Sequence, residues 1–150
     1  MTESENPESD GNSPAWWVLL APVLVMGTIF FLSSRSHLPD LTHGNDIQNV
    51  IGHFTAYAAL GATLALLFRA MGWGILRALL AAILIATLYG VSDEFHQSFV
   101  PNRNVDAKDV LVDFLGAATG ALAMMRLIDY RNAANATSDA APDPPADESS

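Results

Sequence analysis

Four long apolar segments, separated by short polar stretches, occupy the middle of the chain. They run from residue 15 to 32, from 47 to 68, from 75 to 92 and from 105 to 125. A membrane hydrocarbon core of about 30 Å is crossed by a helix of roughly 20 mainly apolar residues, and each segment approaches that length. The fourth is the weakest, because three aspartates and a lysine occupy its first half. We therefore predict an all-α fold, an integral membrane bundle of four transmembrane helices.

The segments that flank this bundle differ from it in composition. Residues 1–14 and 128–150 are rich in Ser, Asn, Pro and acidic residues, which predicts disordered tails around a transmembrane domain at 15–127. A cleaved signal peptide is the rival interpretation of the first apolar segment. The preceding residues carry four acids and no Lys or Arg, which is not the basic start of a signal peptide. We expect the first segment to be a membrane span.

Composition narrows the function classes. Charged residues make up 15% of the chain, compared with about 25% in ordinary soluble domains. The net charge of −9 arises largely from the tails, and no basic patch offers the attraction that nucleic acids require. We therefore expect no nucleic acid partner. The chain has no cysteine, so disulfides, thiolate metal ligands and cysteine nucleophiles are excluded.

The distribution of basic residues predicts the orientation. Four spans place both termini and the loop between the second and third spans on one side of the membrane. Cytoplasmic loops carry an excess of Lys and Arg, so we expect both termini in the cytoplasm. The margin is four basic residues to three, namely Arg69, Arg77, Arg126 and Arg131 against Arg35, Arg103 and Lys108.

Polar side chains form a stripe on each of the last three predicted helices. At 100° per residue, the polar positions of the second span fall within an arc of about 80° and those of the third within about 100°, with Glu94 roughly another 60° round. In the fourth span, aspartates align with Gly116 and Gly120, small residues that let helices approach closely. The stripes consist of Asp46, Asn49, His53 and Tyr57 in the second span, Tyr89, Asp93, His96 and Gln97 in the third, and Asp106, Asp109 and Asp113 in the fourth.

The three stripes are expected to meet at one membrane face, because they lie at the start, the end and the start of successive spans. A charge at the centre of a span costs about 2.5–3.5 kcal/mol on insertion scales, so such residues usually face the bundle interior and pair with one another. Pro101 and Asn102 form a turn pair, and Asn104 or Asp106 is expected to cap the fourth helix. Arg103, at the tip of the connection, either folds back onto the carboxylates or binds an external anion such as a phosphate.

The stretch SDEFHQSFVPNR, followed by the aspartates of the fourth span, resembles the VanZ-like family of bacterial membrane proteins. The motif SSRS at the end of the first span and HFTAY in the second support the resemblance, which runs from about Leu32 to Gly120. The chain has Asn102 where the family usually has Gly. Asn tolerates the left-handed turn conformation, so this departure is compatible with the same turn.

The resemblance implies a multi-pass protein of the bacterial cell membrane. For the member that gives the family its name, it implies low-level resistance to the glycopeptide teicoplanin. It implies no reaction, and we expect no cofactor. It also implies a shared ligand-binding site at the matching positions, which are Arg35, His53, Tyr57, Asp93, Glu94, His96, Gln97, Arg103, Asp109 and Asp113.

Three interpretations of these polar residues remain open. In the first, a cell-envelope accessory factor binds an anionic headgroup or envelope precursor at the extracytoplasmic face, with Arg35 and Arg103 as anion contacts. In the second, the residues form a purely structural network that holds the helices in register. In the third, histidines and carboxylates hold a divalent metal that hydrolyses a lipid or envelope precursor, although the sequence has no HExxH or GxSxG motif.

Two further partners are expected. Membrane lipid surrounds any such bundle. A second copy of the chain is the other, because stripes of small residues drive helix association in membranes. The faces considered for such a homo-oligomer are Gly61/Ala65 and Gly116/Gly120.

Overall fold

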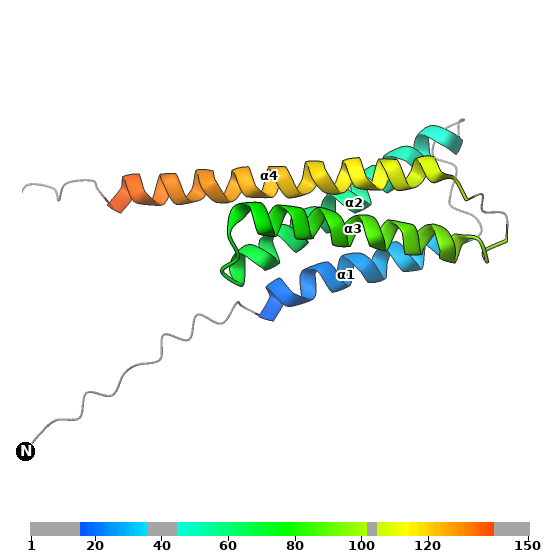
Figure 1. Ribbon diagram of the computed structural model, residues 1–150, viewed down its shortest axis with the longest axis horizontal. Helices are drawn as coiled ribbons and strands as arrows, with labels where there is room; N and C mark the ends of the chain where they lie inside the picture. The colour runs from blue at the N-terminus through cyan, green and yellow to red at the C-terminus, as the bar shows by residue number, and fades with distance from the viewer. Residues whose placement is uncertain (1–15, 36–44, 102–104, 140–150) are drawn as a thin grey trace, which may run out of the picture.

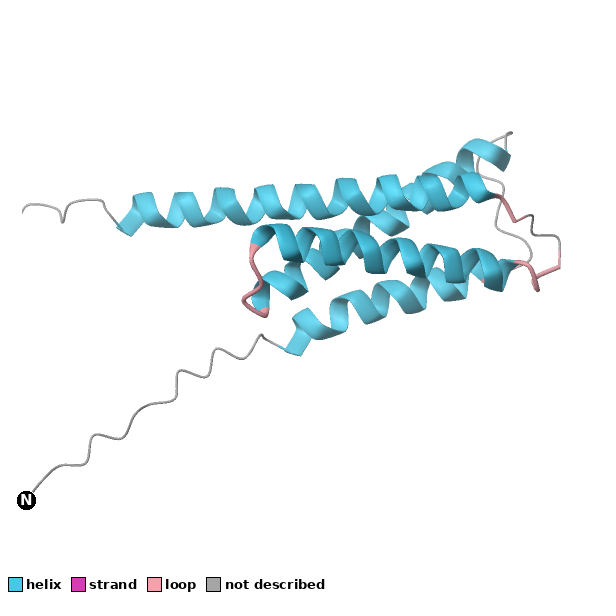
Figure 2. Cartoon of the chain, viewed as in Figure 1, coloured by secondary structure: helices cyan, strands magenta, loops and turns pink. Residues whose placement is uncertain are grey.

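A computed structural model of the protein describes residues 16–35, 45–101 and 105–139. These residues form four α-helices, which are α1 (Trp16–Ser33), α2 (Asn45–Ala70), α3 (Ile75–Gln97) and α4 (Ala107–Asp139) (Figure 1). Figure 2 shows helices joined by loops, with no strand in the part of the chain that is described. All four helices are long and apolar enough to cross a membrane. The predicted all-α bundle of four membrane-spanning helices is confirmed.

Successive helices run in opposite directions along the bundle. The end of α1, the start of α2, the end of α3 and the start of α4 therefore lie together at one end, which we call the site end (Figure 1). α2 and α4 make the most extensive contact, α3 packs against both, and α1 packs against α2 and to a smaller extent against α3. The core of the site end is thus bounded by α2, α3 and α4.

Glycines bring the backbones of α2 and α4 into direct contact. A Cβ atom on Gly120 would overlap the carbonyl oxygen of Ala58, and one on Gly61 would overlap that of Ala117. Gly116 lies similarly close to α2. Such close approach of small residues is how helices associate in lipid, where apolar burial gives no advantage over lipid contact.

The two small-residue faces that were considered for oligomerisation are buried inside the protomer. Gly61 and Gly120 pack on the opposite backbone, and Ala65 is 0% exposed. A second copy cannot reach these faces without separating α2 from α4. This corrects the expected oligomer surface, while a homo-oligomer formed through another surface stays a prediction.

α3 turns its small residues inward and its large ones outward. Ala78, Ala82 and Ala86 recur every four residues and are each 0% exposed. The opposite face carries leucines that are 57–68% exposed, namely Leu76, Leu80, Leu84 and Leu88. A continuous apolar face of this kind is unfavourable in water and suits the hydrocarbon of a membrane.

Two helices, α3 and α4, extend five residues or more beyond the apolar segments that predicted them. α3 continues past residue 92 to Gln97, and α4 continues to Asp139, beyond the ends of the other helices (Figure 1). Residues 128–139 are therefore helical, although the composition of 128–150 predicted a disordered tail. Residues 131–138 are all exposed, so the strong helix propensity of Ala133, Ala134 and Ala136 accounts for this extension better than packing does.

Candidate functional site

Polar side chains from three helices meet inside the site end. We call this group the inner cluster; it consists of Asn49 and His53 on α2, Glu94 on α3, and Asp109 and Asp113 on α4. The three carboxylates are 4%, 6% and 0% exposed, in the order Glu94, Asp109, Asp113. Asn49 and His53 are four residues apart on α2, and Asp109 and Asp113 are four residues apart on α4, so each pair lies on one face of its helix. These two faces contact each other.

Two side-chain contacts join these faces of α2 and α4. His53 Nδ1 lies 2.9 Å from Asp113 Oδ1, with the two side chains 11% and 0% exposed. One turn nearer the site end, Asn49 Nδ2 donates a hydrogen bond to Asp109 Oδ2 at 2.8 Å. Gly90 on α3 makes room for the deeper contact, between His53 and Asp113, because a Cβ there would lie 2.6 Å from Asp113 Oδ2.

Glu94 reaches the inner cluster from α3 and is tied to the start of α4. Its Oε2 accepts a hydrogen bond from the backbone N–H of Asp106 at 3.1 Å. Asp106 Oδ1 in turn accepts one from the backbone N–H of Lys108 at 2.9 Å, which is the contact of a helix N-cap. Of the two residues predicted to cap this helix, Asp106 does so, and Asn104 lies outside the described residues.

A second polar group, the α1–α3 cluster, lies on the other side of α3; its members are Ser33, Ser34, Asp93, His96 and Gln97. Ser33 Oγ donates to Asp93 Oδ2 at 2.7 Å, and Gln97 Nε2 donates to the same oxygen at 3.0 Å. Ser34 Oγ and His96 Nε2 are 3.0 Å apart. Adjacent residues point about 100° apart on a helix, so Asp93 bonds to α1 while Glu94 faces α2 and α4.

Two tyrosines lie deeper in the bundle, between the clusters. Tyr57 is 1% exposed, and its ring centroid is 6.2 Å from that of His53 and 6.4 Å from that of Tyr89. The Tyr89 hydroxyl donates to the carbonyl oxygen of Met26 on α1 at 2.7 Å. The tyrosines close the polar region on the side of the apolar core.

The sequence model of the VanZ/LLP1 family matches residues 13–128. This match covers more than half of the chain and includes every residue of both clusters. The chain belongs to the VanZ/LLP1 family. No match was found among curated proteins or among solved structures.

The VanZ/LLP1 domain brings together most of the residues predicted from the sequence. His53, Glu94, Asp109 and Asp113 converge in the inner cluster, with Tyr57 beneath them. Asp93, His96 and Gln97 lie at the same end of the bundle but turn towards α1. The role of these residues in ligand binding stays a prediction.

The two arginines predicted as anion contacts are placed less fully. Arg35 follows α1 at the site end, where it is exposed and its guanidinium carbon lies 4.4 Å from the centroid of the Phe31 ring. Arg103 lies outside the described residues. A contact between either arginine and the carboxylates therefore stays a prediction.

Three members of the clusters were not among the site residues predicted from the sequence. Asn49 had been placed on the polar stripe of the second span, one turn before His53, and that position was the available signal. Ser33 and Ser34 belong to the SSRS motif that supported the family resemblance. Serine side chains in membrane helices commonly bond to the backbone of their own helix. Only the contact with Asp93 on α3 therefore distinguishes Ser33 from such a serine.

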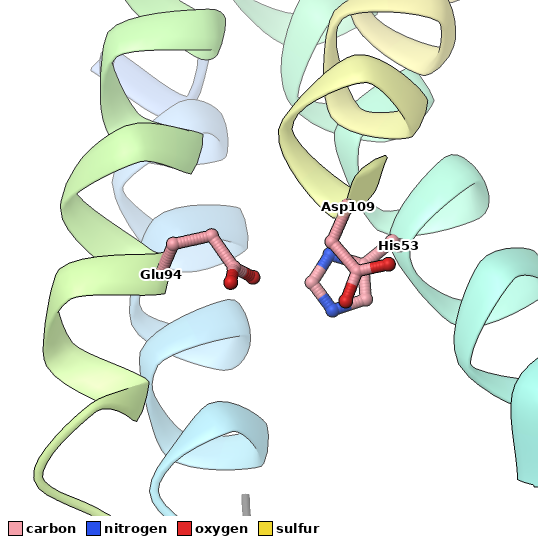
Figure 3. A group of neighbouring side chains, drawn as sticks. All are labelled: His53, Glu94 and Asp109. Atoms are coloured by element: carbon pink, nitrogen blue, oxygen red, sulfur yellow. The ribbon is translucent and has the colours of Figure 1, made fainter. Parts of the chain in front are cut away.

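The inner cluster has hydrogen-bonding and coordinating capacity that the described residues do not use. A ring nitrogen of His53 and carboxylate oxygens of Glu94 and Asp109 lie within 4.8 Å of one another, and Figure 3 shows the three side chains facing a common space. Within the described part of the chain, Glu94 Oε1 and Asp113 Oδ2 are buried without a hydrogen-bond partner. The cluster can therefore accept hydrogens from a ligand or coordinate a cation.

Proposed function

We propose that this VanZ/LLP1 protein is a cell-envelope accessory factor that binds the headgroup of an anionic envelope lipid or precursor at the site end. In this proposal the site end faces the outside of the cell and both termini lie in the cytoplasm. In this proposal Arg35 and Arg103 bind a phosphate of the ligand, and the carboxylates of the inner cluster accept hydrogens from its hydroxyl or amide groups.

One observation supports this proposal most strongly, namely the buried carboxylate oxygens without partners. Glu94 and Asp113 are 4% and 0% exposed, yet each has one oxygen that no described residue bonds. Leaving a buried polar group unpaired costs about 1–3 kcal/mol, and more for a charged group. A network selected only to hold helices together is expected to satisfy such atoms, whereas a binding site leaves them for its ligand.

The position of the cluster supports access by a headgroup. Asn49 and Asp109 lie within the first turns of α2 and α4, and Glu94 lies in the last turn of α3. Residues this close to helix ends lie near the headgroup region of a bilayer of ordinary thickness. Arg35 follows α1 at the same end and is exposed there.

Lipid retention tests the proposal directly. The full chain, purified in mild detergent, is incubated with phosphatidylglycerol, which has a phosphate and hydroxyls, or with phosphatidylcholine, and bound lipid is counted by native mass spectrometry. We expect preferential retention of phosphatidylglycerol, reduced at least fivefold in Arg35→Gln and Glu94→Gln. The matched control is Arg77→Gln, because Arg77 lies at the opposite end, 5.6 Å from the centroid of the Trp73 ring.

Equal loss in all three variants would show ordinary lipid association and overturn the proposal. A matching cellular test is teicoplanin tolerance on overexpression, which Glu94→Gln should abolish at unchanged protein level. If tolerance instead falls only in step with the amount of folded protein, the purely structural interpretation replaces this one.

A metal-dependent hydrolase is the second candidate, and one observation favours it, namely the convergence of His53, Glu94 and Asp109. A metal held by such donors can activate water for cleavage of a phosphoester. Metal-dependent release of phosphate from a lipid by the purified chain would support this candidate over simple binding.

A further inference from the structure

We infer that His53, Glu94 and Asp109 form a binding site for one divalent transition-metal cation of the zinc and manganese class. The three residues come from α2, α3 and α4, so the ion would join all three helices at the site end. Figure 3 shows the imidazole and the two carboxylates pointing toward one another from these helices.

The spacing of the donor atoms is close to that of a metal centre. All three donors lie within 4.8 Å of one another. Three atoms about 4.8 Å apart are roughly 2.8 Å from their common centre, whereas Zn–N and Zn–O bonds are about 2.0–2.2 Å. Each donor atom must therefore move by at most about 0.8 Å, which small rotations about the bonds of its side chain supply.

A second and independent observation points to a ligand, namely the state of Glu94. This residue is 4% exposed, and its Oε1 has no hydrogen-bond partner among the described residues. Its other oxygen, Oε2, is held by the backbone N–H of Asp106. The carboxylate is thus fixed in a direction that faces His53 and Asp109 (Figure 3).

Each donor residue has a separate partner that fixes its orientation. Asp113 Oδ1 lies 2.9 Å from His53 Nδ1, and Asn49 Nδ2 donates to Asp109 Oδ2 at 2.8 Å. Together with the Asp106 N–H on Glu94, this gives one supporting contact for each of the three donors. Metal-binding histidines and carboxylates are typically oriented by such outer contacts, and a carboxylate behind the imidazole is one of the usual forms.

The charge of the inner cluster also favours a bound cation. The inner cluster gathers three carboxylates, Glu94, Asp109 and Asp113, around a single imidazole. Even with the imidazole protonated, carboxyl groups outnumber the single positive charge here, in a bundle surrounded by apolar side chains. A divalent cation neutralises this excess, because buried charges in membranes persist only where they are paired or coordinate an ion.

The donor set defines the class of ion. One imidazole nitrogen and two carboxylate oxygens, without a thiolate, suit zinc, manganese or ferrous iron better than soft copper(I), which prefers sulfur. Three protein donors leave at least one coordination position open. That position can take a phosphate oxygen, and this last step alone rests on the proposed binding of an anionic headgroup.

Metal binding by the purified chain tests the site. The full chain in detergent is treated with EDTA, dialysed, and titrated with Zn²⁺ or Mn²⁺ alone by calorimetry, with the stoichiometry checked by elemental analysis. We expect one ion per chain, and affinity at least tenfold weaker in Glu94→Gln and Asp109→Asn. The matched control is Asp129→Asn, an exposed aspartate of α4 near the opposite end, which should bind as the wild type does.

A measurement on the wild type avoids dependence on variant folding. Bound Mn²⁺ should show coupling to a ¹⁴N nucleus in pulsed electron paramagnetic resonance, from the His53 imidazole. Folded wild type that binds neither ion in stoichiometric amount, or bound Mn²⁺ without nitrogen coupling, overturns the site.

The outcomes for metal and headgroup are distinguishable. Phosphatidylglycerol binding that persists after EDTA treatment keeps the proposed function and refutes the metal as its bridge. One bound ion in a chain that shows no preference for phosphatidylglycerol keeps the metal site and refutes the proposed headgroup.

Discussion

Replacement of Gly120 by alanine tests the contact that holds α2 against α4. The added methyl group would overlap the carbonyl oxygen of Ala58. Overpacking a well-packed interior typically costs about 1–3 kcal/mol. The overlapping atom belongs to the backbone, so it cannot rotate away as a side chain does, and the helices must separate instead.

An opposing term must be subtracted from this cost. Alanine is favoured over glycine inside a helix by about 0.5–1 kcal/mol. The overlap outweighs this gain, so we expect Gly120→Ala to lower the free energy of unfolding by about 1–2 kcal/mol. The measurement is reversible unfolding in mixed micelles of dodecylmaltoside and sodium dodecyl sulfate, followed by helical circular dichroism.

Two further variants separate packing from helix propensity. Gly52 on α2 is exposed, and a Cβ there would meet nothing within 4 Å, so Gly52→Ala should leave stability unchanged or raise it by up to about 1 kcal/mol. The double variant Ala58→Gly/Gly120→Ala should not recover stability, because the overlap is with the carbonyl oxygen and not with the Ala58 methyl. If Gly120→Ala is as stable as Gly52→Ala, the close approach of α2 and α4 is wrong.

Three other predictions concern the ends of the bundle. A cysteine at Ser34 should react with an impermeant maleimide in intact cells and one at Gly72 should not, because these positions lie at opposite ends; the reverse pattern would invert the orientation. Ser33→Ala should lower the free energy of unfolding by about 1–3 kcal/mol, because it leaves the buried carboxylate of Asp93 with one donor fewer. The control Ser92→Ala loses only an exposed bond to its own helix, so it should change the free energy of unfolding by less than about 0.5 kcal/mol. A chain that ends at residue 130 should keep the unfolding midpoint of the full chain, because residues 131–138 are all exposed; a clear drop would mean that this extension packs on something.

The sequence determined the membrane class of the protein and the helix faces that carry polar residues. Apolar length alone predicts the four spans, because a helix must satisfy its backbone internally to cross hydrocarbon. Helical periodicity placed His53 on one face of α2 and Asp113 on one face of α4. The shared depth of these positions followed from the alternating direction of the spans. Their convergence at one end of the bundle was therefore predictable before any tertiary structure.

Periodicity cannot determine how each helix is rotated relative to its neighbours. Asp93 and Glu94 are adjacent acids with similar sequence surroundings, and only the packing of α3 assigns Asp93 to α1 and Glu94 to the inner cluster. The same holds for the glycines: the sequence shows Gly61, Gly116 and Gly120 as small residues, but not whether they face another helix of the same chain or a second copy. Their backbone contacts between α2 and α4 settle this within the chain.

The tertiary structure also decided what the polar residues bond to. A stripe gives the direction in which a side chain leaves its helix, whereas hydrogen bonds depend on distances of about 3 Å between atoms of different helices. Only these distances show that Asn49 donates to Asp109, that Ser33 donates to Asp93 and that the Asp106 N–H donates to Glu94. They also show that Glu94 Oε1 and Asp113 Oδ2 keep no partner in the described chain, and this is a feature of the fold, which no pattern of residue types contains.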